Sequence, residues 1–265
     1  MEIDIEKVIA ELTVEEKIKL LSGGDAWHTQ EIESMDIPNI TLTDGPHGVR
    51  LEDKEAGEFF QSKPATSFPI EAAMAASWNQ DLIEEMGQKM GEECQYYDVG
   101  VLLGPGVNGK RSPLAGRNFE YFSEDPYLSG KIGASFVKGV QSEGVGTSVK
   151  HYVANEQETN RMVVSSEVDE RTLREIYLLP FEMIVNEANP WTMMCAYNKV
   201  NGTPMSQNKK YLVDVLKDEW GYEGLIMSDW GAVGDKVASI KAGLDLEMPG
   251  PGKEDEKALQ AFEAG

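Results

Sequence analysis

The sequence predicts an α/β fold, a TIM-type (β/α)8 barrel that is either complete or cut short at its C-terminal end. Three observations predict it. Short apolar segments alternate with segments of helical periodicity, which is the pattern of a parallel sheet covered by helices. The length of 265 residues is close to the roughly 250 typical of such a barrel. Polar residues follow most apolar segments, and the C-terminal strand ends of a barrel meet at one mouth. An open doubly wound sheet, which fits the alternation alone, is the alternative.

The elements follow one another without an internal repeat or a linker, so residues 1–265 are expected to be one barrel domain. The expected helices cover 13–23, 79–93, 127–142, 169–188, 209–219, 236–241 and 254–264. The expected strands cover 40–43, 99–103, 146–149, 192–196, 225–228 and 244–246. A capping box formed by Thr13 and Glu16 begins the first helix. The alanine-rich residues 72–77 have an ambiguous period and are a candidate for a further strand.

Composition excludes several classes of protein. A formal net charge of −22 argues against nucleic acids and anionic membranes as partners. No run of about 18 apolar residues is present, so no membrane span is expected. Cys94 and Cys195 are far apart and form no C-x-x-C pair, which is typical of buried thiols in a cytoplasmic protein. The three histidines form no metal-binding cluster, so neither a metal nor a cofactor is expected.

The glycine-rich stretch GPGVNGK at 104–110 satisfies two phosphate-binding patterns. Both patterns require a helix that begins directly after the glycines, because its N-terminal N–H groups face the phosphates. Arg111 stands where a Ser or Thr would hold Mg²⁺, and Pro113 disfavours helical geometry in the residue before it. The stretch is therefore expected to be a loop with another purpose.

Six blocks of sequence, in order, resemble the N-terminal barrel of the β-glucosidases of glycoside hydrolase family 3. They are LTVEEKIKLLSG, TDGPHGVR, GPGVN with GRNFEYFSEDPYLSG, VKHYVANEQETNR, MMCAYNKVNG and GLIMSDWGAV, and they extend from about Leu12 to Pro249. The resemblance implies retaining hydrolysis of terminal β-D-glucosides. It also implies that the glycine-rich stretch is a loop of the sugar site that leads to Arg117.

The resemblance assigns the catalytic nucleophile to Asp229, in SDW after an apolar strand. A retaining glycosidase needs one carboxylate to attack the anomeric carbon and a second carboxyl to protonate the leaving group. The remaining matched residues are implied to bind a β-glucoside or a small oligosaccharide: Asp44, Arg117, Lys150, His151, Arg161, Met194, Tyr197 and Trp230. Lys150 and His151 are expected to donate hydrogen bonds to sugar hydroxyls.

Other roles remain open for these residues. Asp229 could cap a helix and Asp44 could shape an Asp-Gly-Pro turn. The two arginines could form ordinary surface ion pairs, and Met194 could fill the core.

The resemblance stops at the proton donor. In the family's β-glucosidases the acid/base glutamate comes from a second domain after the barrel. In a related N-acetylglucosaminidase branch it is replaced by a His on the loop after the K-H strand, and KHYVANEQETNR has no second His. A second domain or a partner chain is therefore expected to supply the acid/base Glu. The alternative is a carbohydrate-binding or fragment barrel without turnover, while β-xylosidase and N-acetylglucosaminidase activities fit less well.

Overall fold

Five parallel strands form the centre of the fold. The computed structural model describes residues 4–53, 61–252 and 254–264. The strands hydrogen-bond in chain order, and they are β1 (Leu42–Asp44), β2 (Val101–Leu103), β3 (Gly146–Tyr152), β5 (Thr192–Cys195) and β8 (Leu225–Ser228). An unbroken order excludes the doubly wound alternative, in which the strand order reverses at a switch point. The sheet is a TIM-like barrel wall, as the sequence predicts.

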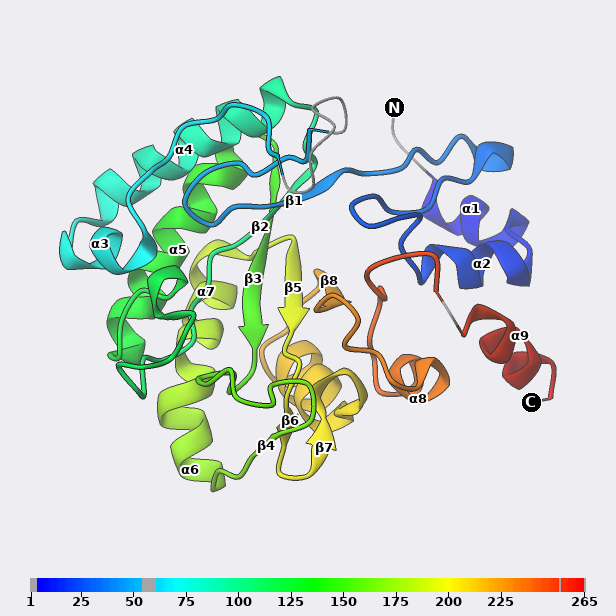
Figure 1. The fold of residues 1–265 in the computed structure, drawn as a ribbon. Coiled ribbons are helices and arrows are strands. Elements are labelled where there is room, and N and C mark those ends of the chain that lie inside the picture. The colour runs from blue at the N-terminus through cyan, green and yellow to red at the C-terminus, as the bar shows by residue number, and fades with distance from the viewer. Residues whose placement is uncertain (1–3, 54–60, 253, 265) are drawn as a thin grey trace.

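Helices cover the outer face of this wall (Figure 1). They are α3 (Glu71–Ala76), α4 (Gln80–Tyr96), α5 (Pro126–Ser142), α6 (Glu170–Thr172) and α7 (Leu179–Ala188), with a π-helical segment at Leu173–Leu178 between the last two. Helices α4 and α5 approach closely because glycine lies between them. A Cβ atom on Gly139 would stand 2.1 Å from the Glu84 carbonyl oxygen. A π-helical segment over Lys210–Glu219 precedes β8.

The sector between β8 and β1 is spanned by isolated bridges instead of strands, so strand hydrogen bonding does not close the barrel. Met227 pairs with Leu246, Glu247 with Ser22, and His28 with Thr41, which directly precedes β1. A small apolar cluster fills the interior that these segments enclose: Leu42, Val101, Leu103, Met194, Met227, Leu246 and Met248. The much larger cluster lies between the sheet and its helices.

The two ends of the described chain pack together beside this sector. Helices α1 (Ile5–Glu11), α2 (Val14–Leu20), α8 (Lys236–Lys241) and α9 (Asp255–Glu263) lie there (Figure 1). The ammonium group of Lys236, on a residue only 1% exposed, contacts Asp255 and Ser22 and lies 3.3 Å from Glu247 Oε2. A buried cation with two carboxylates around it fixes α8 and α9 to the turn after α2.

Short elements complete the chain. A second sheet is formed by β4 (Ser165–Ser166), β6 (Lys199–Val200) and β7 (Thr203–Pro204), and 3-10 turns cover Glu33–Met35, Asn118–Glu120 and Met205–Gln207. In the described residues no helix is long and apolar enough to cross a bilayer.

Two of the predicted strands are wrong. Residues 72–77 belong mostly to helix α3, because alanine and methionine favour a helix. Residues 244–246 contribute only the bridge from Leu246 to Met227. There the Asp245 carboxylate accepts the Ile226 N–H at 2.8 Å. In a regular strand pair that N–H would donate to a backbone carbonyl instead of a side chain.

Candidate functional site

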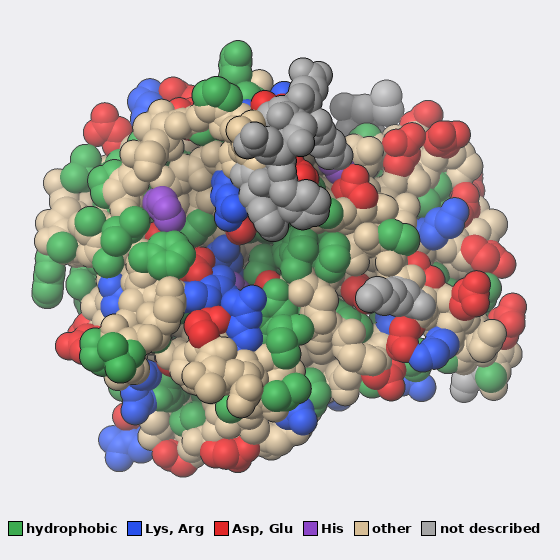
Figure 2. Space-filling view, in the orientation of Figure 1, with side chains coloured by type: hydrophobic (Ala, Val, Ile, Leu, Met, Phe, Trp, Pro, Cys, Tyr) green, Lys and Arg blue, Asp and Glu red, His purple; other side chains and the backbone are tan. Residues whose placement is uncertain are grey.

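One cavity of about 250 Å³ opens where the C-terminal ends of the strands meet. Figure 2 shows Lys and Arg side chains gathered in a hollow on this face, next to hydrophobic ones. All nine residues that the sequence predicted for the site line the cavity: Asp44, Arg117, Lys150, His151, Arg161, Met194, Tyr197, Asp229 and Trp230. Trp27 and Leu103 line it as well.

Most of these side chains are placed by the strand that they end or follow, and Arg117 and Arg161 come from the loops after β2 and β3. Lys150 and His151 are the fifth and sixth residues of β3, and Asp229 directly follows β8. Asn108, in the glycine-rich loop, forms hydrogen bonds with both backbone groups of His151. Its Oδ1 accepts the His151 N–H at 2.8 Å, and its Nδ2 donates to the His151 carbonyl at 3.0 Å. No helix begins in this loop before the turn at Asn118, so phosphate binding stays excluded and the loop fixes the end of β3.

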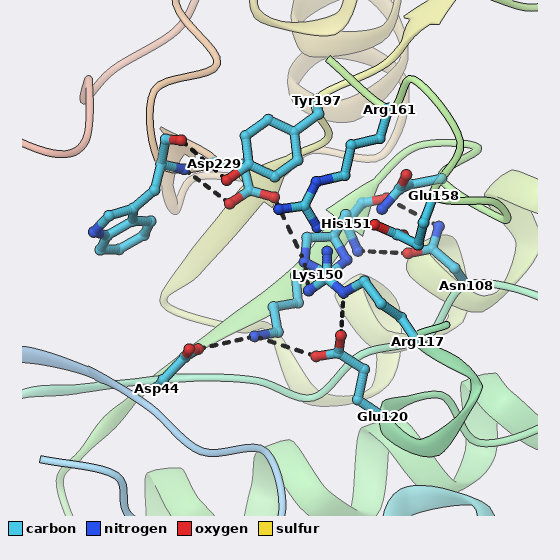
Figure 3. A network of polar contacts seen from close by, with 12 residues as sticks. Asp44, Asn108, Arg117, Glu120, Lys150, His151, Glu158, Arg161, Tyr197 and Asp229 are labelled. Carbon is cyan, nitrogen blue, oxygen red and sulfur yellow. Dashed lines mark hydrogen bonds and ion pairs between the residues drawn. The ribbon is translucent and has the colours of Figure 1, made fainter. Parts of the chain in front are cut away.

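Opposite charges alternate along one side of the cavity (Figure 3). Lys150 Nζ lies 3.2 Å from Asp44 Oδ1 and 3.7 Å from Glu120 Oε2, while Arg117 Nε donates to the other Glu120 oxygen. Burial disfavours both charges of the Lys150–Asp44 pair, but their mutual attraction outweighs it. The pKa of Lys150 is therefore raised and that of Asp44 lowered. Both groups stay charged and offer a fixed donor and a fixed acceptor to a ligand.

One oxygen of the Asp229 carboxylate has a backbone partner, and the neighbouring Tyr197 hydroxyl helps to lower the pKa of this carboxyl. Oδ1 accepts the Trp230 N–H at 2.8 Å. Oδ2 is buried and has no hydrogen-bond partner among the described residues. Burial raises the pKa of Asp229, and the nearby charges of Arg117 and Lys150 oppose that rise. The side chain is thus oriented, weakly solvated and free at the oxygen that lies 3.6 Å from His151 Nε2.

His151 is buried among cations. Burial and the charges of Arg117 and Lys150 lower its pKa well below the ordinary value, so the ring is neutral. An Arg117 Nη2 lies 2.8 Å from Nε2, and the Tyr121 hydroxyl lies 3.1 Å from Nδ1. Both ring nitrogens therefore have a fixed partner.

Aromatic side chains form the opposite wall. The rings of Trp27 and Trp230 lie 5.5 Å apart at 38°, and the Trp230 Nε1–H donates to the Ala26 carbonyl at 2.8 Å. The Arg161 guanidinium stacks 4.5 Å above the Tyr197 ring. Met194 belongs to the interior apolar cluster and also lines the cavity floor, so it both packs and faces the site.

Sequence reasoning missed the supporting residues. Trp27 comes from the turn after α2, some two hundred positions from its partner Trp230, and no local pattern indicates that pairing. Glu120 and Tyr121 lie within the GRNFEYF block, and the spacing of Glu120 three residues after Arg117 was the available signal. Among the described residues no cluster of three His, Cys, Asp or Glu side chains could hold a metal. Cys94 and Cys195 are buried free thiols, and burial raises the pKa of each to about 12.

Comparison with known proteins finds one family. Residues 25–265 match the model of the glycosyl hydrolase family 3 N-terminal domain. Thermostable β-glucosidase B of Acetivibrio thermocellus is 55% identical, over all of this chain and 36% of its own length. An exo-α-(1→6)-L-arabinopyranosidase of Bifidobacterium longum is 54% identical, over 97% of this chain and 34% of its own length.

A solved structure shares the architecture. β-Glucosidase 3B from Thermotoga neapolitana, in complex with glucose, superposes with a TM-score of 0.93 at 45% identity. The match covers 98% of this chain and 39% of the larger protein. The chain thus spans between a third and two fifths of the length of these relatives.

Proposed function

Because the chain belongs to glycosyl hydrolase family 3, we propose that residues 1–265 form the N-terminal barrel domain of a longer retaining β-glucosidase. The proposed reaction releases the terminal non-reducing β-D-glucosyl unit of a small glucoside. Asp229 is the proposed nucleophile, and the other eight lining residues predicted from the sequence are proposed to bind the sugar. The relatives named β-glucosidase support this proposal.

The free Oδ2 of Asp229 is the observation that carries the proposal. A carboxylate attacks through one oxygen, and here the Trp230 N–H orients the carboxylate through Oδ1 while Oδ2 has no hydrogen-bond partner among the described residues. Oδ2 would attack the anomeric carbon while the bond from that carbon to the glycosidic oxygen breaks. The leaving oxygen takes a proton from an acid, and water later cleaves the glycosyl ester.

The charges of the cavity fit a polyhydroxylated ligand. Lys150 presents up to three N–H donors, and Asp44 presents acceptor oxygens beside it. A sugar hydroxyl is both a donor and an acceptor, so such an ion pair can bind two neighbouring hydroxyls. The ring pair of Trp27 and Trp230 offers an apolar face on which a sugar can pack.

We further propose that the acid/base carboxyl comes from a second domain or a partner chain. The Lys150 ammonium group lowers the pKa of Asp44 and favours its ionised form, and Glu120 is already paired with Arg117 and Lys150. Burial raises the pKa of Glu156 to about 8, so this carboxyl could carry a proton. However, Glu156 accepts hydrogen bonds from Asn108 and Gly109 and is not among the described residues that line the cavity.

The test is covalent labelling with a dinitrophenyl 2-deoxy-2-fluoro-β-D-glucoside, followed by intact mass and peptide mapping. This reagent carries an activated leaving group, so it needs little acid assistance. We expect one added fluoroglucosyl group on Asp229. Asp229→Asn should abolish labelling and turnover of activated glucosides while glucose binding changes little, because the amide keeps the shape and loses the nucleophile.

Asp214→Asn is the matched control, since this Asp is largely exposed. Labelling of the Asp229→Asn variant at the wild-type rate would remove Asp229 from the mechanism. Glucose binding without any labelling of the unmodified chain would instead support the carbohydrate-binding alternative.

The sugar preference requires a separate comparison, because one relative is named for α-L-arabinopyranosides. We expect aryl β-D-glucosides to react faster than aryl α-L-arabinopyranosides and β-D-xylosides with the same leaving group. Faster reaction of either competitor would reassign the substrate and leave the nucleophile unchanged.

A further inference from the structure

The ring of His151 lies between Arg117, which Figure 3 shows beside it, and Tyr121, and these two side chains constrain where its proton lies. The Arg117 Nη2 group is 2.8 Å from Nε2. The guanidinium carries only donors, so Nε2 must accept, and its lone pair points toward Arg117. Since burial and the nearby cations keep the ring neutral, its single proton is on Nδ1.

The partner of that proton is Tyr121, a buried residue outside the cavity lining. Its hydroxyl oxygen lies 3.1 Å from Nδ1 and accepts the Nδ1–H. Asn155 Nδ2 donates to the same oxygen at 3.4 Å, and the Tyr121 hydroxyl donates to the Asn155 carbonyl at 3.5 Å. The Tyr121 hydroxyl then donates one hydrogen bond and accepts two, which is its full capacity. The donor and acceptor roles along this series of hydrogen bonds are therefore consistent with one another.

We infer that Tyr121 is a positioning residue that helps to hold His151 in the Nδ1–H tautomer, so that Nε2 accepts from Arg117 and carries no proton toward Asp229. The effect on catalysis rests on the proposed function, whereas the position of the His151 proton does not depend on it. This position reverses the expectation that His151 donates to a sugar hydroxyl, because the one ring proton is used on Tyr121 and Nε2 accepts from Arg117.

The position of the His151 proton affects Asp229, the proposed nucleophile. Nε2 lies 3.6 Å from Asp229 Oδ2, the oxygen that has no hydrogen bond among the described residues. With a lone pair on Nε2 the two atoms cannot hydrogen-bond, and Oδ2 stays free to attack. The opposite tautomer would place an N–H next to Oδ2, and that bond would make the carboxylate a weaker nucleophile.

Removing the hydroxyl of Tyr121 should therefore shift the tautomer. In a Tyr121→Phe variant the Nδ1–H would be buried without an acceptor, which is costly. Moving the proton to Nε2 would relieve that cost and form a bond to Asp229, once the Arg117 guanidinium has turned away from Nε2. The ring size is unchanged, so packing against His151 at 6.0 Å is retained.

The direct measurement is a long-range ¹H–¹⁵N spectrum of the full chain with ¹⁵N-labelled histidine. The chain has three histidines, so assignment by single substitution of His28 and His47 is practical. We expect His151 to be neutral near pH 7 with the proton on Nδ1 in the wild type. An Nε2–H tautomer in the wild type overturns the inference whether or not any variant folds.

The second measurement is kinetic and uses the fluoroglucoside reagent. Tyr121→Phe should lower the maximal labelling rate constant about tenfold, the equivalent of about one hydrogen bond on the nucleophile. The half-saturating reagent concentration should change much less. Tyr222→Phe is the matched control, because this hydroxyl is also buried and has no partner among the described residues.

The outcomes separate the two proposals. An Nδ1–H tautomer in a chain that is never labelled keeps the inference and removes the proposed activity. Normal labelling with the tautomer unchanged in Tyr121→Phe removes the inference and keeps the activity. A loss of labelling equal in Tyr222→Phe would indicate a general effect on packing, which also contradicts the positioning role.

Discussion

At the scale of single residues, the charge of Asp229 is set by two opposing effects. Burial raises its pKa, and the positive charge of Arg117 is the main influence that lowers it. Arg117 in turn is held by Glu120 and contacts His151. The ionised carboxylate required for attack therefore depends on a cation that acts through space, from another position in the same buried cavity.

Replacing Arg117 with glutamine should move the pH dependence of labelling. Without the cation the Asp229 carboxyl binds its proton more tightly, so the acidic limb of the labelling rate should shift to higher pH. Arg117→Lys keeps the charge and should shift the limb less. The measurement is the second-order rate constant for the fluoroglucoside over the acidic and neutral range, and an unmoved limb in the glutamine variant would contradict the role given to Arg117.

Residue types and motifs predicted the lining of the cavity well, because most of those side chains stand at strand ends. Asp44, Lys150 and Asp229 each follow or end an apolar segment, and such positions can be recognised from sequence. Trp27 and Tyr121 could not be recognised in the same way. Their roles arise from contacts with Trp230 and His151 that depend on how distant segments pack.

At the scale of elements, the turn after β1 contacts helix α3 through a partly exposed histidine and a buried glutamate. His47 Nδ1 lies 3.3 Å from Glu71 Oε2, and the Glu71 side chain is fully buried. The contact with Glu71 raises the pKa of His47, and burial raises the pKa of Glu71. This pair holds the loop that begins with Asp44 against α3.

The stability of the protein should therefore fall as pH rises through this pair. Both pKa values are higher in the native state, so the native state binds more protons than the unfolded chain. The loss begins above the ordinary glutamate pKa of about 4.3 and continues above the ordinary histidine pKa of about 6.5. Its size is about 1.4 kcal/mol per unit of pKa shift.

Glu71→Gln should flatten this dependence, as measured by denaturant unfolding from acidic to slightly alkaline pH. Glu187→Gln, at a partly exposed carboxylate paired with Lys131, is the control and should keep the wild-type dependence. An equal slope in wild type and Glu71→Gln would show that the pair does not couple stability to protons.

Element predictions succeeded where a cap or a strong period marks the segment. The capping box at Thr13 and the Asn79 cap of α4 are both present. They failed where local composition and tertiary pairing disagree. The period of residues 72–77 fits a helix or a strand, and only the packing of the segment against α5 decides for the helix. Residues 244–246 are Leu-Asp-Leu, which resembles a strand, yet they pair with β8 at a single position.

At the scale of the whole molecule, the proposed proton donor lies outside this chain. General acid assistance is typically worth about 10²–10⁴-fold, and a sugar alkoxide needs it far more than a dinitrophenolate does. The purified chain should therefore hydrolyse dinitrophenyl glucoside at a measurable rate and cellobiose far more slowly. A partner that supplies the carboxyl should restore cellobiose hydrolysis, and formate or azide should partly rescue turnover. Comparable rates on both substrates with the chain alone would show that a proton donor is already present.

The architecture as a whole was predictable and its closure was not. Alternation of apolar and helical segments predicts a parallel sheet, and polar strand ends favour a barrel over an open sheet. Nothing in the local sequence indicates that the sector between β8 and β1 is spanned by Ser22, His28 and Leu246 through single bridges.

Those single bridges bear on the order in which the chain folds during synthesis. Strands β1, β2, β3, β5 and β8 pair with their neighbours in chain order, so the wall can grow as each strand leaves the ribosome. The bridge between Ser22 and Glu247 joins residues more than two hundred positions apart and can form only after nearly all of these residues have been synthesised. The contact between Trp27 and Trp230 likewise joins the first part of the chain to its last third. We therefore expect the side of the cavity formed by these two rings to assemble after the wall of strands β1, β2, β3 and β5.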